Sequence, residues 1–207
     1  MSILKKVNGL RRVLMDRITS NIGHSGVGVT ADLNSKVEIK RVLICRPNHR
    51  LGNLLLLTPL VQEVIDTFPN CKIDLFVKGG LAPIIFRNYQ NIDQIIPKKP
   101  FKNSIAYIQG WVSLKKHHYD VVINSVRHSS SGKLSVQFAN STYKLFGADT
   151  LDIQFQEKDY GHVAKYSIYD LRSYLTRLGF PINNKPPASL DLKLTPLEIA
   201  EGKNILN

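Results

Sequence analysis

The chain has 207 residues, of which 43% are hydrophobic and 21% charged, and its formal net charge is +12. Length and composition indicate a soluble globular protein with one sizeable core and extensions. No apolar run approaches the roughly 18 residues that a membrane-spanning helix needs, and the N-terminus lacks the apolar core and cleavage site of an export signal.

The first 38 residues are predicted to form a basic amphipathic helix followed by a flexible linker. Apolar residues recur at three- and four-residue intervals between Ile3 and Ile18, and most lysines and arginines lie off that stripe. Such a helix can lie in the interface of an anionic membrane, or it can pack on the protein's own core; both readings stay open. Residues 20–35 have the Gly, Ser, Thr and Asn content of a linker.

Residues 41–77 predict a strand, a loop, a helix and a second strand. Arg41–Cys45 is a short apolar run typical of a strand buried on both faces. The loop Arg46–Gly52 contains proline and glycine, Asn53–Phe68 has helical spacing, and Lys72–Val77 is the second strand. Sheets built from such βαβ units bind ligands at the carboxyl ends of their strands, so we expect function in the loop that leaves the first strand.

The alternation continues to about residue 180. It predicts an α/β fold, a Rossmann-like doubly wound parallel sheet, as a domain over residues 39–180. The further predicted strands are 92–96, 119–124 and 142–146, and the further helices are 81–88, 104–117, 133–140 and 162–178.

Residues 181–207 are interpreted as a linker and the start of a second domain. The linker composition of residues 181–188 is followed by Thr195-Pro-Leu-Glu198, a capping box with proline at the first helical position. We therefore expect a second domain to be missing from this chain, which would then be truncated or an isolated half.

The charge distribution and the two cysteines indicate the kind of partner and the cellular compartment of the protein. Residues 97–144 carry most of the excess of lysine and arginine, so the basic surface predicts an anionic partner. Cys45 and Cys71 have no second cysteine or histidine at metal-ligand spacing, which favours reduced, packed thiols in a cytoplasmic protein. Nucleic-acid binding is disfavoured because the aromatic residues form no stacking arrangement.

Several motifs resemble the N-terminal domain of glycosyltransferase family 9, the lipopolysaccharide heptosyltransferases. The resemblance covers about residues 40–207 and is carried by Arg41-Val-Leu-Ile-Cys-Arg46, Leu51-Gly-Asn-Leu-Leu-Leu-Leu-Thr-Pro59, Ile73-Asp-Leu-Phe-Val77 and His118-Tyr-Asp-Val-Val-Ile123. It implies the N-terminal half of a GT-B fold, which supplies the acceptor side of a cleft. It also implies inverting transfer without a metal ion or cofactor, from a nucleotide sugar such as ADP-heptose to a lipopolysaccharide-core acceptor.

The resemblance places the catalytic base at Asn53, where the family usually has aspartate. An amide cannot accept the proton of the attacking hydroxyl, so Asn53 either orients a substrate or serves as a helix N-cap. His49 in the same loop is an alternative base, because imidazole titrates near neutral pH. Catalysis by the usual route is therefore in doubt.

Acceptor binding is assigned to basic and polar residues near two strand ends. Guanidinium groups suit the carboxylates and phosphates of an inner lipopolysaccharide core. The candidates are Arg46, Arg50 and Gly52 in the first loop, Arg127, His128, Ser129 and Ser130 after the strand 119–124, and His162 by the resemblance.

Two functions of different class follow. The first is a heptosyltransferase-like enzyme of lipopolysaccharide biosynthesis in the cell envelope, peripheral at the inner face of the cytoplasmic membrane, in which this chain is the acceptor-binding half. The second is a non-catalytic domain that binds anionic glycans or an anionic membrane surface.

Overall fold

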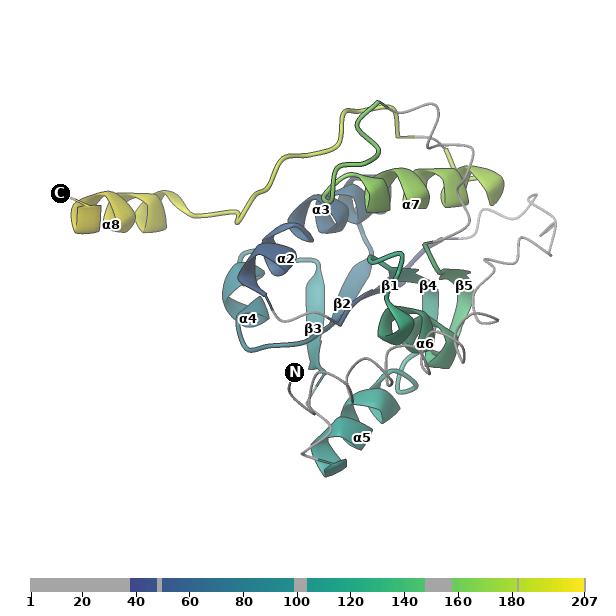
Figure 1. Cartoon of the computed structure of the whole chain (residues 1–207). Coiled ribbons are helices and arrows are strands. Elements are labelled where there is room, and N and C mark those ends of the chain that lie inside the picture. Colours follow the sequence, from purple (N-terminus) through teal and green to yellow (C-terminus); the bar gives the residue numbers. More distant parts are fainter. Residues whose placement is uncertain (1–37, 48–49, 99–103, 148–157, 182, 207) are drawn as a thin grey trace, which may run out of the picture.

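The computed structural model describes residues 38–47, 50–98, 104–147, 158–181 and 183–206. Five parallel strands form one sheet in the order β3-β2-β1-β4-β5 (Figure 1). The strands are β1 (Arg41–Arg46), β2 (Lys72–Val77), β3 (Ile92–Pro97), β4 (Tyr119–Asn124) and β5 (Ser141–Leu145). The helices are α2 (Leu51–Leu55), α3 (Thr58–Thr67), α4 (Ala82–Ile85), α5 (Ser104–Ser113), α6 (Ser130–Phe138), α7 (Tyr166–Arg177) and α8 (Pro196–Leu206).

Helices cover both faces of the sheet, as the alternating pattern predicts. Val42 and Ile44 of β1 point to one face, where they pack with α2, α3, α4 and α7. Leu43 and Cys45 point to the other face, where they pack with α5 and α6. The predicted α/β fold with a doubly wound parallel sheet is therefore confirmed, and both cysteines are buried free thiols, as expected.

The predicted helix Asn53–Phe68 is wrong in one respect, because the structure divides it into α2 and α3. Pro59 lacks the N–H that would bond to the Leu55 carbonyl in a continuous helix. The Thr58 hydroxyl donates to that carbonyl instead, with 2.8 Å between Oγ1 and the oxygen. Apolar residues keep helical spacing across this break, so the spacing does not predict where α2 ends and α3 begins.

Two other helix starts differ from the prediction. The helix expected from Lys133 begins at Ser130, because the Ser129 hydroxyl accepts from the Gly132 N–H at 3.1 Å and caps it. The helix expected from His162 begins at Tyr166, after a turn in which the His162 carbonyl accepts from the Lys165 and Tyr166 amides. The expected N-terminal helix lies outside the described residues.

The charged groups at the amino end of the sheet compensate one another. Asp74 of β2 is fully buried, accepts two guanidinium nitrogens of Arg41, and accepts the Tyr119 hydroxyl at 2.9 Å. Arg41 also bonds to Asp93 at 2.5 Å. This network joins β1, β2, β3 and β4.

A second buried ion pair joins α3 to α7. Arg172 donates to both carboxylate oxygens of Glu63, at 2.8 and 2.7 Å, and the Asn183 amide donates to the same carboxylate at 3.0 Å. Glu63 is only 4% exposed, so its buried carboxylate would be strongly destabilising without these partners.

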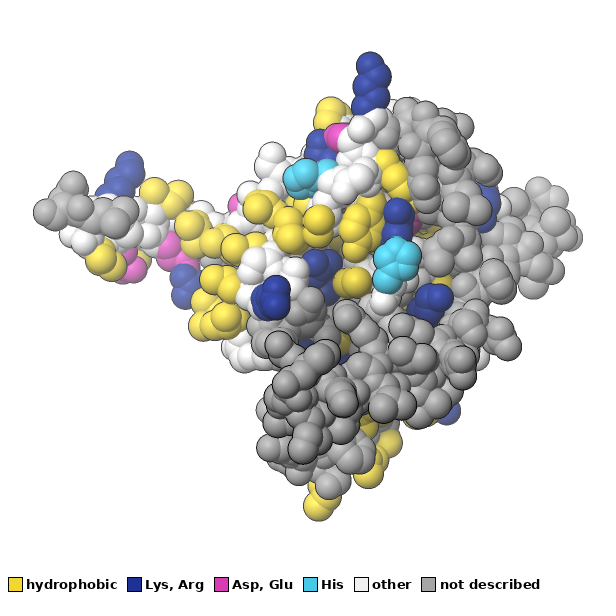
Figure 2. Space-filling model, in the orientation of Figure 1, with side chains coloured by type: hydrophobic (Ala, Val, Ile, Leu, Met, Phe, Trp, Pro, Cys, Tyr) yellow, Lys and Arg dark blue, Asp and Glu magenta, His cyan; other side chains and the backbone are white. Residues whose placement is uncertain are grey.

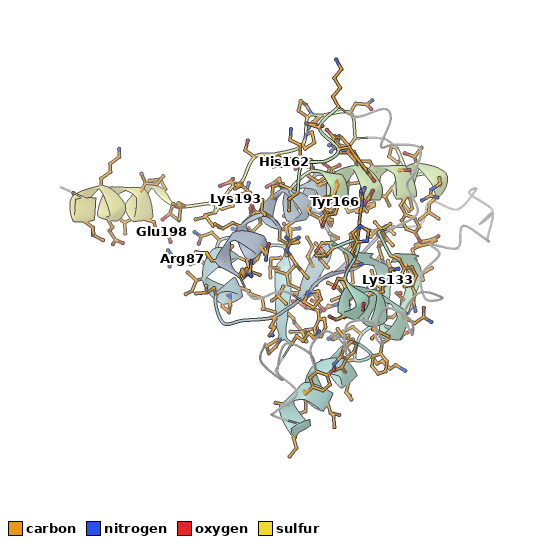
Figure 3. The ribbon with its side chains drawn as sticks, in the orientation of Figure 1. Arg87, Lys133, His162, Tyr166, Lys193 and Glu198 are labelled. Atoms are coloured by element: carbon orange, nitrogen blue, oxygen red, sulfur yellow. The ribbon has the colours of Figure 1, made fainter. Side chains whose placement is uncertain are left out.

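The C-terminal arm is held against the residues that follow α4. The Tyr89 hydroxyl donates to the Asp191 carbonyl at 2.7 Å, and the Asn88 amide donates to the Lys193 carbonyl and to Glu198. Arg87 pairs with Glu198 (Figure 3). The predicted capping box is confirmed, since Thr195 N–H donates to Glu198 at 2.7 Å and Glu198 N–H donates to Thr195 Oγ1 at 3.3 Å.

Candidate functional site

The candidate site lies at the carboxyl ends of β1 and β4. These strands are neighbours, with Cys45 opposite Asn124, yet the chain continues from β1 toward β2 and from β4 toward β5. The strand order therefore reverses between them, and open α/β sheets bind ligands at such a switch point.

Arg46 ends β1 and is the central residue of the site. It is only 3% exposed, and its guanidinium makes two long hydrogen bonds of 3.5 Å, to the Ser125 carbonyl and to the Asn53 amide oxygen. Among the described residues, its Nε has no hydrogen-bond partner and its guanidinium makes no ion pair. Burial lowers the pKa of Arg46, and Tyr166 partly opposes that shift. A buried cation without a carboxylate is costly unless an anion binds it.

Tyr166, the first residue of α7 (Figure 3), also belongs to the candidate site. Its hydroxyl donates to the Ser125 carbonyl at 3.0 Å, the same oxygen that accepts from Arg46. Burial raises the pKa of Tyr166, so the neutral phenol is favoured. The sequence prediction missed Tyr166, because its role depends on contacts with residues far away in the sequence, such as Ser125, 41 positions earlier.

Arg127 is part of the site, but its charge is already compensated. Its guanidinium makes paired bonds of 3.1 and 2.9 Å to Asp170, a buried carboxylate of α7 that also accepts the Tyr160 hydroxyl at 2.7 Å. It lies 4.1 Å from the Tyr160 ring centroid and 4.8 Å from that of Tyr166. The geometry indicates that Arg127 holds Tyr166 and the loop after β4 in place.

Asn53 lies at the site, but not as a helix N-cap. The N-cap of α2 is Arg50, so the interpretation of Asn53 as the cap is wrong. The Asn53 side chain is partly exposed, and its amide oxygen accepts from Arg46. Among the described residues that contact Arg46, none is a carboxylate. His49, the alternative base, lies outside the described residues.

The remaining predicted residues surround this group. Arg50 and Gly52 are exposed at the start of α2, and a Cβ at Gly52 would meet no atom within 4 Å. His128 is exposed, whereas Ser129 and Ser130 form the start of α6. His162 is exposed before α7, where its Nδ1 accepts from the Ala164 amide at 3.3 Å. The structure thus places Asn53 against Arg46, and it links Arg127 to the same site through Tyr166 and Ser125.

The loop after β4 is held rigidly by Asn124. Its amide nitrogen donates to the carbonyls of Val126 and Phe146, each at 2.9 Å, and its oxygen accepts from the Val126 amide at 3.2 Å. A Cβ at Gly132 would lie 2.1 Å from the Asn124 Oδ1, so glycine lets α6 approach closely. Asn124 thereby fixes the Ser125 carbonyl that both Arg46 and Tyr166 use.

In the described part of the chain, no group of three or more His, Cys, Asp or Glu side chains is arranged to hold a metal ion. None of the described helices has both the length and the apolarity needed to cross a bilayer.

The similarity to known proteins is structural. No family model and no curated protein matches the sequence. A glycosyl transferase family 9 structure from Veillonella parvula DSM 2008 matches with a TM-score of 0.51 and 19% identity, over 81% of this chain and 49% of that one. The E. coli heptosyltransferase WaaC with ADP-2-deoxy-2-fluoro heptose matches with a TM-score of 0.45 and 15% identity, over 71% of this chain and 51% of that one.

The chain thus spans about half the length of the solved structures that it matches. The first similarity shows a shared Rossmann-like α/β fold. The resemblance inferred from the sequence motifs is therefore confirmed at the level of the fold.

Proposed function

We propose that these residues form the acceptor-binding half of a heptosyltransferase-like glycosyltransferase, and that Arg46 binds an acidic group of a lipopolysaccharide-core or related glycan. The observation that carries the proposal is a buried guanidinium with no carboxylate among its described contacts, at the switch point of a GT-B-like sheet. A carboxylate or phosphate would accept from Nε and the terminal nitrogens and would offset the cost of burial.

The same half would contribute to an inverting transfer without a metal ion. In a single displacement, the acceptor hydroxyl must lose its proton as it attacks the sugar of the nucleotide donor, which we take to be ADP-heptose or a related sugar. Asn53 can accept a hydrogen bond from Arg46 and orient the acceptor, but an amide cannot take that proton. We assign His49 the role of base for the complete site, and we place the enzyme at the inner face of the cytoplasmic membrane.

Acceptor binding is tested by calorimetric titration of the 207-residue chain with an acidic inner-core oligosaccharide and with a neutral oligosaccharide of the same size. We expect only the acidic ligand to bind, and Arg46→Gln to weaken binding at least tenfold, since a charged hydrogen bond contributes about 1.5–3 kcal/mol. Lys72→Gln, at the opposite end of the sheet, is the control. Equal binding of both sugars would contradict the proposal.

The alternative is a non-catalytic glycan-binding domain, and Asn53 in place of the family's aspartate favours it. Transfer is assayed with the complete gene product that carries these residues, using ADP-heptose and the same acidic acceptor. A product with an inverted anomeric centre supports the enzyme, and His49→Ala should then abolish it. Binding of the acceptor without any product would support the alternative.

A further inference from the structure

The outward side of α5 is an apolar surface where a solvated helix would be polar. The ten-residue helix contains no charged residue. Ile105, Ile108 and Val112 stand three and four positions apart, on one side of the helix, and are 73%, 58% and 59% exposed. Trp111, at the edge of this side, is partly buried and also packs on the sheet. Hydrophobic side chains stand out at the lower tip of the molecule in Figure 2, where Figure 1 places α5.

Aromatic residues extend this surface onto α6. Tyr107 and Trp111 of α5 and Leu134 and Phe138 of α6 line, together with Ile108 and Val112, a shallow apolar depression of about 330 Å³. The rings of Trp111 and Phe138 meet edge to face at 5.8 Å. We call these six residues, with Ile105, the α5 patch. Contiguous exposed apolar surface of this kind marks an interaction site.

Lysine side chains lie beside the aromatic residues of the α5 patch. Lys98 lies 5.9 Å from the Trp111 ring and Lys115 lies 4.5 Å from the Phe138 ring. Lys144 is close to Lys115, and its pKa is lowered by burial and by that neighbour. In residues 104–147 the single acidic side chain is Asp120, which is bonded to the backbone amides of Lys40 and Arg41. Lysines therefore stand at the rim of the α5 patch, next to its aromatic rings.

We propose that the α5 patch docks the protein on the surface of an anionic lipid bilayer. Apolar side chains enter the interface, the aromatic residues lie at the headgroup level, and the lysines meet the acidic headgroups. A second copy of this chain fits less well, because a symmetric contact would bring Lys98 and Lys115 of each copy against like charges. The proposal specifies the contact surface for the membrane location proposed above, but it requires neither sugar transfer nor acceptor binding.

The experiment uses Trp111, the single tryptophan of the chain, as a reporter at the patch. The full 207-residue chain is mixed with vesicles of phosphatidylcholine alone, or of equal parts phosphatidylcholine and phosphatidylglycerol. We expect the Trp111 emission to shift to the blue only with the anionic vesicles. Bromine atoms on the lipid acyl chains should quench it.

Variants separate the patch from other apolar and basic segments. Ile108→Asp combined with Val112→Asp should weaken vesicle binding at least about tenfold, and Lys115→Gln about fivefold. Ile84→Asp on α4, where the isoleucine is 62% exposed, is the matched control and should bind normally. Neutralising Lys5, Lys6, Arg11 and Arg12 should leave the quenching of Trp111 by brominated lipid in place.

Several results would overturn the proposal. The first is an equal Trp111 emission with neutral and anionic vesicles. The second is a loss of vesicle binding in the Ile84→Asp control as large as in the variant with Ile108→Asp and Val112→Asp. The third is a loss of Trp111 quenching when the N-terminal charges are neutralised. Because the acidic-oligosaccharide titration uses no lipid, failure here and failure of the proposed function are distinguishable.

Discussion

The substitution Arg46→Met tests whether the buried charge of Arg46 lowers the free energy of unfolding. Methionine has a similar length and removes the buried charge, while the Ser125 carbonyl keeps its hydrogen bond from Tyr166 at 3.0 Å. The bonds that are lost, to Ser125 and Asn53, are both long at 3.5 Å. We therefore expect the variant to be more stable than the parent.

The magnitude follows from the lack of compensation. Replacing a buried ion pair by well-packed apolar side chains is often neutral or stabilising by about 1–4 kcal/mol, and the two long hydrogen bonds reduce the gain here. We expect the free energy of unfolding to rise by about 1–2 kcal/mol, which corresponds to roughly 2–8 °C in Tm for a domain of this size. Arg172→Met is the contrast, because it leaves the buried Glu63 carboxylate without its cation and should cost about 3–5 kcal/mol.

The assay is thermal and urea unfolding with increasing inorganic phosphate. Phosphate should raise the Tm of the parent chain by mass action, and Arg46→Met should abolish that response while Arg172→Met keeps it. If Arg46→Met destabilised the protein as much as Arg172→Met, then Arg46 would have a compensating partner and the reasoning would fail.

Three further predictions concern single residues. Asn53→Asp should add about 1 kcal/mol of stability, because the new carboxylate pairs with Arg46. This pairing lowers the carboxyl pKa in the folded state below its unfolded value of about 3.9. The free energy of unfolding should therefore show the gain at pH 7 and lose it below the folded pKa. Gly132→Ala should cost at least about 1–3 kcal/mol in urea unfolding, because its Cβ would overlap the Asn124 side chain; a neutral effect would show that α6 is not tightly packed there. Burial raises the pKa of Tyr89 to about 12, so its contribution to stability should be full below about pH 10 and lost toward pH 12; Tyr89→Phe should remove that part of the alkaline loss.

The strands were predictable because each is a short apolar run bounded by polar residues, proline or glycine. Lys72–Val77 and Tyr119–Asn124 match their predicted bounds. The break between α2 and α3 was not predictable from periodicity, because apolar residues keep helical spacing across it. The two helices separate where Pro59 lacks an amide N–H and the Thr58 hydroxyl donates to the Leu55 carbonyl instead.

The positions of the candidate site residues were predictable where position along a strand decides them. Arg46 ends β1 and Arg127 follows β4, and the parallel sheet brings those strand ends together. Their different electrostatic states were not predictable, because Arg127 meets Asp170 only through the packing of α7, 43 positions along the chain. Tyr166 was missed for the same reason, since no local pattern distinguishes it from other tyrosines of that helix.

The Arg41–Asp74–Tyr119 network gives the two ends of the sheet different tolerance to mutation. It clamps the central strands at the amino end with short, charge-compensated bonds. Amide protons there should exchange with solvent only by global unfolding, whereas those near Arg46 open at lower free energy. Ligand specificity can therefore diverge at the carboxyl end through substitution, while the opposite end keeps the strands in register.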